Sequence, residues 1–98
     1  MLKSSLLKEA LKFISEHPEI AKRFLDTELE MPNIPFPTFG GPVFWTTLAE
    51  FNGYRLQQNQ FTHHARILDC NNVRIAWGTL NGMEKALDRL ILFAQKYS

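Results

Sequence analysis

The sequence predicts a small α+β domain: two N-terminal helices, a proline-rich strap, a further helix, a three-stranded antiparallel sheet and a C-terminal helix. Apolar residues recur with helical spacing at both ends of the chain, prolines and glycines cluster after residue 30, and residues 55–77 alternate between apolar and polar side chains. With 98 residues, 45% of them hydrophobic, the chain can fill one core. We expect a single domain over 1–98, with a helical hairpin (1–30), the strap (31–42) and an αβββα unit (43–98).

Two helices joined at an elbow are expected within residues 1–30. Pro18 is typical of a first helical position, where its missing N–H is not needed, and it marks the start of the second helix. Lysines and glutamates opposite the apolar stripes indicate solvated faces. The stripe of the first helix consists of Leu7, Ala10, Leu11 and Ile14. The stripe of the second consists of Ile20, Phe24, Leu25 and Leu29.

The strap, MPNIPFPTFGGP, contains four prolines and two glycines, so it cannot form a central strand or continue a helix. Its apolar residues, Ile34, Phe36 and Phe39, are expected to pack back on the domain, where prolines lower the entropy lost on ordering. The alternative is a partner contact, either as a proline-rich ligand segment or as a strap exchanged between subunits. Phe36 and Phe39 are therefore candidate contact residues.

Residues 43–52 are ambiguous between helix and strand. A helix is favoured by Pro42 as a first helical residue, by Gly53 as a left-handed terminal residue and by the spacing of aromatic and leucine side chains. Aromatic and β-branched residues at 43–47 favour a strand instead. In that alternative, a strand over 43–51 is joined by an Asn52-Gly53 hairpin turn to the next strand.

The register of the expected three-stranded sheet depends on which side chains must be buried together. A three-residue turn at 70–72 pairs Ile67 with Ile75 and Arg66 with Ala76, whereas a two-residue turn would mix apolar and charged residues on one face. The turn ends at an asparagine, which tolerates a left-handed conformation. Leu56 then pairs with Ile67, and residues 60–63 form the other connection. The apolar side of the last strand carries Val73, Ile75 and Trp77.

The opposite side of this sheet carries the candidate binding residues. They are Arg55, Gln57, His64, Arg66 and Arg74. One predicted row across the sheet contains Arg55, Leu68 and Arg74, and the next contains Gln57, Arg66 and Ala76. Three interpretations stay open: a solvated face, a surface whose guanidiniums bind phosphates or carboxylates, or a face covered by the first helices or another subunit. Residues 51–80 carry three arginines and Asp69 alone, so this segment is electropositive.

The final segment, TLNGMEKALDRLILFAQKYS, is the clearest helix, and Asn81 or Thr79 can cap it. Its expected core face consists of Met83, Ala86, Leu87, Leu90, Ile91 and Ala94. From residue 43 onward, the order helix, three strands, helix resembles that of double-stranded RNA-binding domains. Those domains hold phosphates with a lysine-rich start of their second helix, where this chain has only Lys85. A DNA-inserted three-stranded sheet backed by one helix is a second analogy, and it would use Arg55, Arg66 and Arg74.

No catalytic or metal-binding constellation is evident. His63 and His64 are adjacent, so in a strand they point to opposite faces and are unsuited to one metal ion. The single cysteine, Cys70, falls in a turn without a group that would activate its thiol. It also excludes an internal disulfide, which fits a reducing cytoplasm. Lysines near the N-terminus interrupt any apolar stretch of membrane-spanning length.

The expected function is therefore that of a small, non-enzymatic cytoplasmic binding or adaptor domain that needs no cofactor, metal or membrane. Its net charge of +1 is far from that of a protein whose whole surface contacts nucleic acid. Nucleic-acid binding through the local arginine face is the alternative. Self-association is also expected, because Phe44, Trp45 and Phe61 are more large aromatics than one small core covers.

Overall fold

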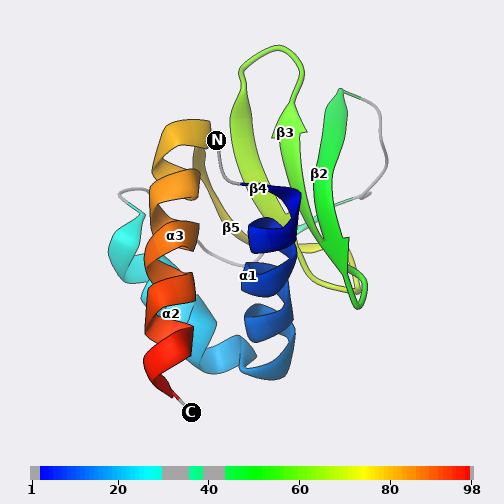
Figure 1. Ribbon diagram of the computed structural model, residues 1–98. Helices are drawn as coiled ribbons and strands as arrows, with labels where there is room; N and C mark the ends of the chain where they lie inside the picture. Colours follow the sequence, from blue (N-terminus) through cyan, green and yellow to red (C-terminus); the bar gives the residue numbers. More distant parts are fainter. Residues whose placement is uncertain (1–2, 30–35, 39–43, 98) are drawn as a thin grey trace.

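The computed structural model describes residues 3–29, 36–38 and 44–97. In these ranges, helices pack on one side of an antiparallel sheet (Figure 1). The helices are α1 (Ser4–Glu16), α2 (Pro18–Glu28) and α3 (Leu80–Tyr97). The strands are β1 (Phe36–Pro37), β2 (Trp45–Phe51), β3 (Tyr54–Asn59), β4 (His64–Leu68) and β5 (Val73–Thr79). Their order across the sheet is β1-β5-β4-β3-β2, so the fold is α+β with four full strands and a two-residue edge strand.

The three helices pack on the core through the stripes that their spacing predicts, although Ile20, Phe24 and Ala94 are only partly buried. Leu11 and Ile14 of α1, Leu25 of α2 and Leu87 and Leu90 of α3 are fully enclosed. They meet one row of the sheet, formed by Ala49, Leu56, Ile67 and Ala76. Pro18 begins α2 as expected. The hydroxyl of Thr79 accepts the backbone N–H of Gly82 at 3.0 Å, which identifies Thr79 as a capping residue of α3.

The helix expected at 43–52 is wrong: residues 45–51 form β2, as in the alternative. Asn52 (φ 50°) and Gly53 (φ 81°) both have positive φ, as a two-residue hairpin turn requires. The Asn-Gly pair and the β-branched residues of this segment therefore outweigh its helical spacing. A Cβ on Gly53 would lie 2.9 Å from the Cβ of Cys70, so this turn also packs closely on the β4–β5 turn. The helix-first order that resembled double-stranded RNA-binding domains is lost with this correction.

The predicted register is correct next to the β4–β5 turn and wrong beyond it. Leu68 pairs with Arg74, and Asn72 closes the three-residue turn with φ 62°. However, Ile67 pairs with Ala76 rather than Ile75, because Ile75 is the extra residue of a β-bulge. The bulge also turns Trp77, expected on the core side, to the opposite face, where it pairs with Arg66. The expected pairing of Leu56 with Ile67 is confirmed.

The strap contributes an edge strand, since Phe36 pairs with Arg74 and Pro37 with Val73. A proline is tolerated there because no ladder hydrogen bond is needed on the outer side. The remaining strap residues, including Ile34 and Phe39, lie outside the described residues. Neither the helices of 4–28 nor the one at 80–97 is both long and apolar enough to cross a membrane.

Candidate binding surface

The sheet face turned away from the helices holds all five predicted binding residues, and we call it the arginine face. It comprises Trp45, Thr47, Glu50, Arg55, Gln57, Asn59, His64, Arg66, Leu68, Arg74, Trp77 and Thr79. The predicted row of Arg55, Leu68 and Arg74 is confirmed by the strand pairing. The next row contains Gln57 and Arg66 as predicted, with Trp77 in place of Ala76 because of the bulge.

The centre of the arginine face is buried rather than solvated. Leu68 and Gln57 are 0% and 1% exposed, and Arg66 is only 8% exposed. The Nε of Arg66 donates a hydrogen bond to Gln57 Oε1 at 2.9 Å, and Gln57 Nε2 donates to Thr47 Oγ1 at 3.3 Å. The guanidinium carbon of Arg66 lies 3.8 Å from the ring centre of Trp45, which is cation–π geometry. Arg66 is therefore enclosed by an amide and a tryptophan.

The three arginines lie close enough to influence one another. The pKa of Arg66 is lowered from its ordinary value, first by burial and then by the positive charges of Arg55 and Arg74. Arg55 donates to the side-chain oxygen of Asn72, and the guanidinium of Arg74 lies 5.1 Å from the Trp77 ring centre. Arg55, Arg74 and His64 are all half-buried. The periphery of the face is thus partly accessible, while Arg66 itself is not.

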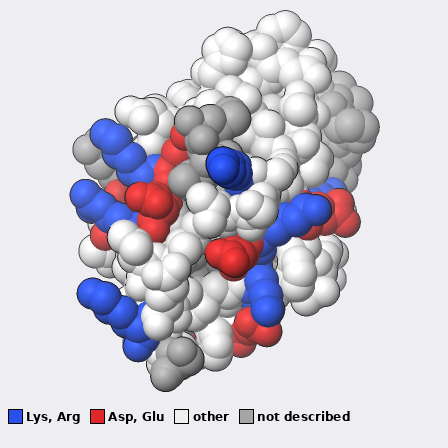
Figure 2. Space-filling model, in the orientation of Figure 1, with Lys and Arg blue, Asp and Glu red and all other residues white. Residues whose placement is uncertain are grey.

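A second feature, the aromatic end, lies where the β3–β4 turn meets the start of β2. Phe44 and Phe61 are 54% and 71% exposed, and their ring centres are 5.2 Å apart. Residues 44–49 and 56–65 contain no Lys, Arg, Asp or Glu. Figure 2 shows this end, in the upper part of the view, as a surface free of charge, whereas blue and red residues gather over the helices. Of the three aromatic residues that the core was expected to leave uncovered, Phe44 and Phe61 are exposed, whereas Trp45 is half-buried.

The turn that presents Phe61 is held in place by its own hydrogen bonds. The side-chain oxygen of Asn59 accepts the backbone N–H groups of Phe61 at 2.8 Å and Thr62 at 2.9 Å. The backbone N–H of Gln60 donates to the carbonyl of Phe44 at 2.8 Å, which ties the turn to β2. Phe44 has φ 65°, a strained conformation for a large side chain. The two rings are therefore presented by an ordered backbone rather than by a loose loop.

The other candidate residues from the sequence are not brought together in one site within the part of the chain that the structure describes. Within residues 3–29, 36–38 and 44–97, no three His, Cys, Asp or Glu side chains are grouped as metal ligands. Cys70 is exposed in the β4–β5 turn. Phe36 is placed in β1 by its backbone, and Phe39 lies outside the described residues, so the proposed contact role of their side chains stays a prediction.

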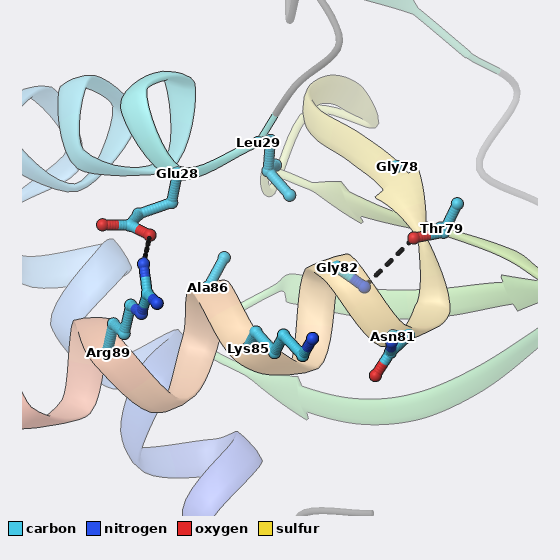
Figure 3. Close-up of a pocket in the computed structure, with 9 residues that line it drawn as sticks. All are labelled: Glu28, Leu29, Gly78, Thr79, Asn81, Gly82, Lys85, Ala86 and Arg89. Carbon is cyan, nitrogen blue, oxygen red and sulfur yellow. Dashed lines mark hydrogen bonds and ion pairs between the residues drawn. The ribbon is translucent and has the colours of Figure 1, made fainter.

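A pocket that the sequence did not predict lies between α2, the end of β5 and the start of α3 (Figure 3). Its volume is about 360 Å³. An ion pair of 2.6 Å between Arg89 Nη1 and Glu28 Oε2 joins α3 to α2 at its wall. Lys85 and the N-terminus of α3 favour negative charge in the pocket, whereas Glu28 opposes it. These opposing charges do not favour one class of ligand. The residues that line the pocket come from three separate segments, so no sequence motif could have predicted it.

Comparison with known proteins gives no further indication of function. No family model matches it, and neither the search of curated proteins nor that of solved structures returned a match.

Proposed function

We propose that this chain is a small, non-enzymatic cytoplasmic binding domain that contacts a protein partner through its aromatic end. The observation that carries the proposal is the pair Phe44 and Phe61, more than half exposed and in ring contact with each other. Large aromatic rings in ordered positions are the residues that dominate protein interfaces, because they bury much area at little loss of conformational entropy. Strained backbone, as at Phe44, also tends to cluster at functional sites.

The chemistry of this end supports binding rather than catalysis. Its exposed side chains are rings, amides and hydroxyls, and residues 44–49 and 56–65 include no carboxylate that could pair with His63 or His64. Because residues 44–49 and 56–65 carry no formal charge, a partner surface of apolar and neutral polar residues fits best.

Photo-crosslinking in the native cell tests this proposal. A photoreactive phenylalanine analogue at position 61 is expected to capture a partner, whereas the same analogue at Leu92, an apolar α3 residue that is 55% exposed, is not. The purified partner should then bind Phe61→Ser at least about 10-fold more weakly than the wild type, as for an interface anchor. Leu92→Ser is the matched control and should bind normally. Equal capture at both positions, or unchanged binding by Phe61→Ser, would contradict the proposal.

Nucleic-acid binding through Arg55, Gln57, His64, Arg66 and Arg74 is the second candidate. It is supported by the proximity of Arg55 and Arg74 to Arg66, whose pKa is lowered first by burial and then by these two positive charges. Retention of random single-stranded and double-stranded oligonucleotides should then fall steeply with salt, with a log–log slope of about 0.9 per neutralised phosphate of a duplex. Arg74 is only half-buried, so its side chain is partly accessible to a phosphate. Arg74→Ala should therefore reduce that slope by about one unit. Absence of salt-sensitive retention would remove this candidate.

A further inference from the structure

The outer edge of β2 is the part of the sheet that a further strand can extend. In the order β1-β5-β4-β3-β2, β2 is outermost, and no other described strand pairs with its outer side. The opposite edge differs, because β1 pairs with β5 there and α2 packs against β5. Thr46 and Thr47 are both exposed. An unpaired edge of aromatic and β-branched residues is a template for strand addition.

The backbone groups that face outward can be identified from one hydrogen bond. The carbonyl of Phe44 accepts the N–H of Gln60 and therefore points toward β3. Within a trans peptide group the N–H points opposite to the carbonyl, so the N–H of Trp45 points away from the sheet. Since donors alternate along an antiparallel strand, the N–H of Thr47 also points outward, whereas that of Thr46 points toward β3. Trp45 and Thr47 thus offer their backbone groups to a new neighbour.

Only the first half of this edge is suited to pairing. A bulge at Leu48 interrupts the strand, and the exposed Glu50 follows it; bulges and charges are the usual protection of free edges. Residues 44–49, by contrast, carry no charge. The unprotected half begins beside Phe44 and Phe61, so the open edge and the exposed aromatics coincide at one end of the sheet.

We propose that the partner at the aromatic end is a second copy of this chain, whose β2 pairs antiparallel with β2 around a two-fold axis at Thr46. This inference rests on the proposed function, because it names the partner of the same surface. Thr47 then lies opposite the partner's Trp45, and Trp45 lies opposite the partner's Thr47. Both outward-facing residues of each copy are satisfied by this register, and the two aromatic ends flank the seam.

Electrostatics permit this self-pairing. In the proposed register, Glu50 and the partner's Glu50 lie four residues from the axis on opposite sides, about 27 Å apart at strand spacing. Since the screening length in physiological salt is about 8 Å, these carboxylates do not repel one another. The paired segment is uncharged on both sides, so no like charges meet at the seam.

Sedimentation equilibrium of the full chain over a range of concentrations tests the proposal, together with two substitutions at one position. The wild type should reach twice the 11.4 kDa mass of one chain. Thr47→Pro removes the outward N–H and should weaken dimerisation at least about 10-fold, since proline fits an edge strand only where nothing pairs with it. Both substitutions remove the Thr47 hydroxyl, but Thr47→Val keeps the backbone N–H. Thr47→Val should therefore dimerise as the wild type does.

Amide hydrogen exchange of the wild type gives a second measurement if Thr47→Pro does not fold. The N–H groups of Trp45 and Thr47 should exchange quickly in dilute solution and become protected at concentrations that favour the dimer. A monomer at all concentrations, or a dimer without this protection, would overturn the inference. The proposed function can survive that result: it stands if Phe61→Ser still weakens a crosslinked partner of another sequence, and it fails with the inference if Phe61→Ser has no effect on any association.

Discussion

Replacing Arg66 with alanine should destabilise the fold, although an arginine on a sheet surface ordinarily contributes little. Its side chain is 8% exposed, and its removal leaves Gln57 Oε1, in a residue that is 1% exposed, without its donor. A buried acceptor left without its hydrogen bond costs about 1–3 kcal/mol. Loss of the cation–π contact with Trp45, at 3.8 Å, adds roughly 1–2 kcal/mol for a largely desolvated pair.

A smaller opposing effect comes from charge. The pKa of Arg66 is lowered first by burial and then by the positive charges of Arg55 and Arg74, so removing the Arg66 charge relieves some repulsion between the three arginines. We therefore expect Arg66→Ala to lower the free energy of unfolding by about 2–4 kcal/mol. With a urea m-value of about 1–1.5 kcal/mol/M, the unfolding midpoint should fall by roughly 2 M.

Urea unfolding followed by tryptophan fluorescence measures this change, because Trp45 and Trp77 both belong to the arginine face. Arg89→Ala is the matched control: its side chain is 64% exposed and pairs with Glu28 at the surface, so its loss should cost no more than about 1 kcal/mol. If Arg66→Ala changed stability by less than about 0.5 kcal/mol, as a surface substitution does, the interpretation of Arg66 as a buried structural residue would be refuted.

Three further outcomes follow from the packing and the ionisable groups. Leu11→Ala, at a fully buried α1 position, should cost about 2–5 kcal/mol in the same assay, and a loss below 1 kcal/mol would contradict the helix packing. Gly53→Ala should cost about 1–3 kcal/mol, measured by thermal unfolding, because φ is 81° and the new Cβ would meet the Cβ of Cys70 at 2.9 Å. Burial, with the charges of Cys70 and Asp69, raises the pKa of Tyr54, so the folded chain holds that proton to higher pH than the unfolded one. The resulting stability is complete below pH ~10 and is lost as pH rises through the folded pKa, so Tyr54→Phe should flatten this alkaline decline in unfolding free energy.

The helices could be predicted because their signals are local. The stripe containing Leu11 and Ile14 and the start at Pro18 need no information from other parts of the chain, and both are confirmed. The sequence favours a helix at residues 43–52 because proline and glycine at the ends of a segment are typical of helix boundaries as well as of turns. The positive φ expected at Gly53 is real, but it belongs to a hairpin turn whose first residue, Asn52, shares it.

The candidate surface was only partly predictable for a different reason. Strand alternation correctly places Arg55 and Arg66 on one face, but alternation does not tell whether that face is covered. The contact of Arg66 with Trp45 depends on the strand that was expected to be a helix. The exposure of Phe44 and Phe61 was anticipated from the number of large aromatics, whereas their mutual contact depends on the pairing of β2 with the β3–β4 turn.

The two bulges explain how both tryptophans reach the arginine face. In β2, Leu48 is the extra residue, so Leu48 and Ala49 both pack toward the core and the preceding Trp45 turns to the opposite side. In β5, Ile75 is the extra residue beside Ala76, and Trp77 turns in the same way.

Without the bulge in β2, strict alternation from the buried Ala49 would direct Trp45 toward the helices and leave the Arg66 guanidinium without its ring. The same bulge ends the regularly paired part of the edge at Thr47, because Leu48 is the inserted residue. One inserted residue thus completes the enclosure of Arg66 and also limits the edge available to a second copy. The stability of the arginine face and the proposed pairing of β2 are for this reason linked through the same three residues, Trp45 to Thr47.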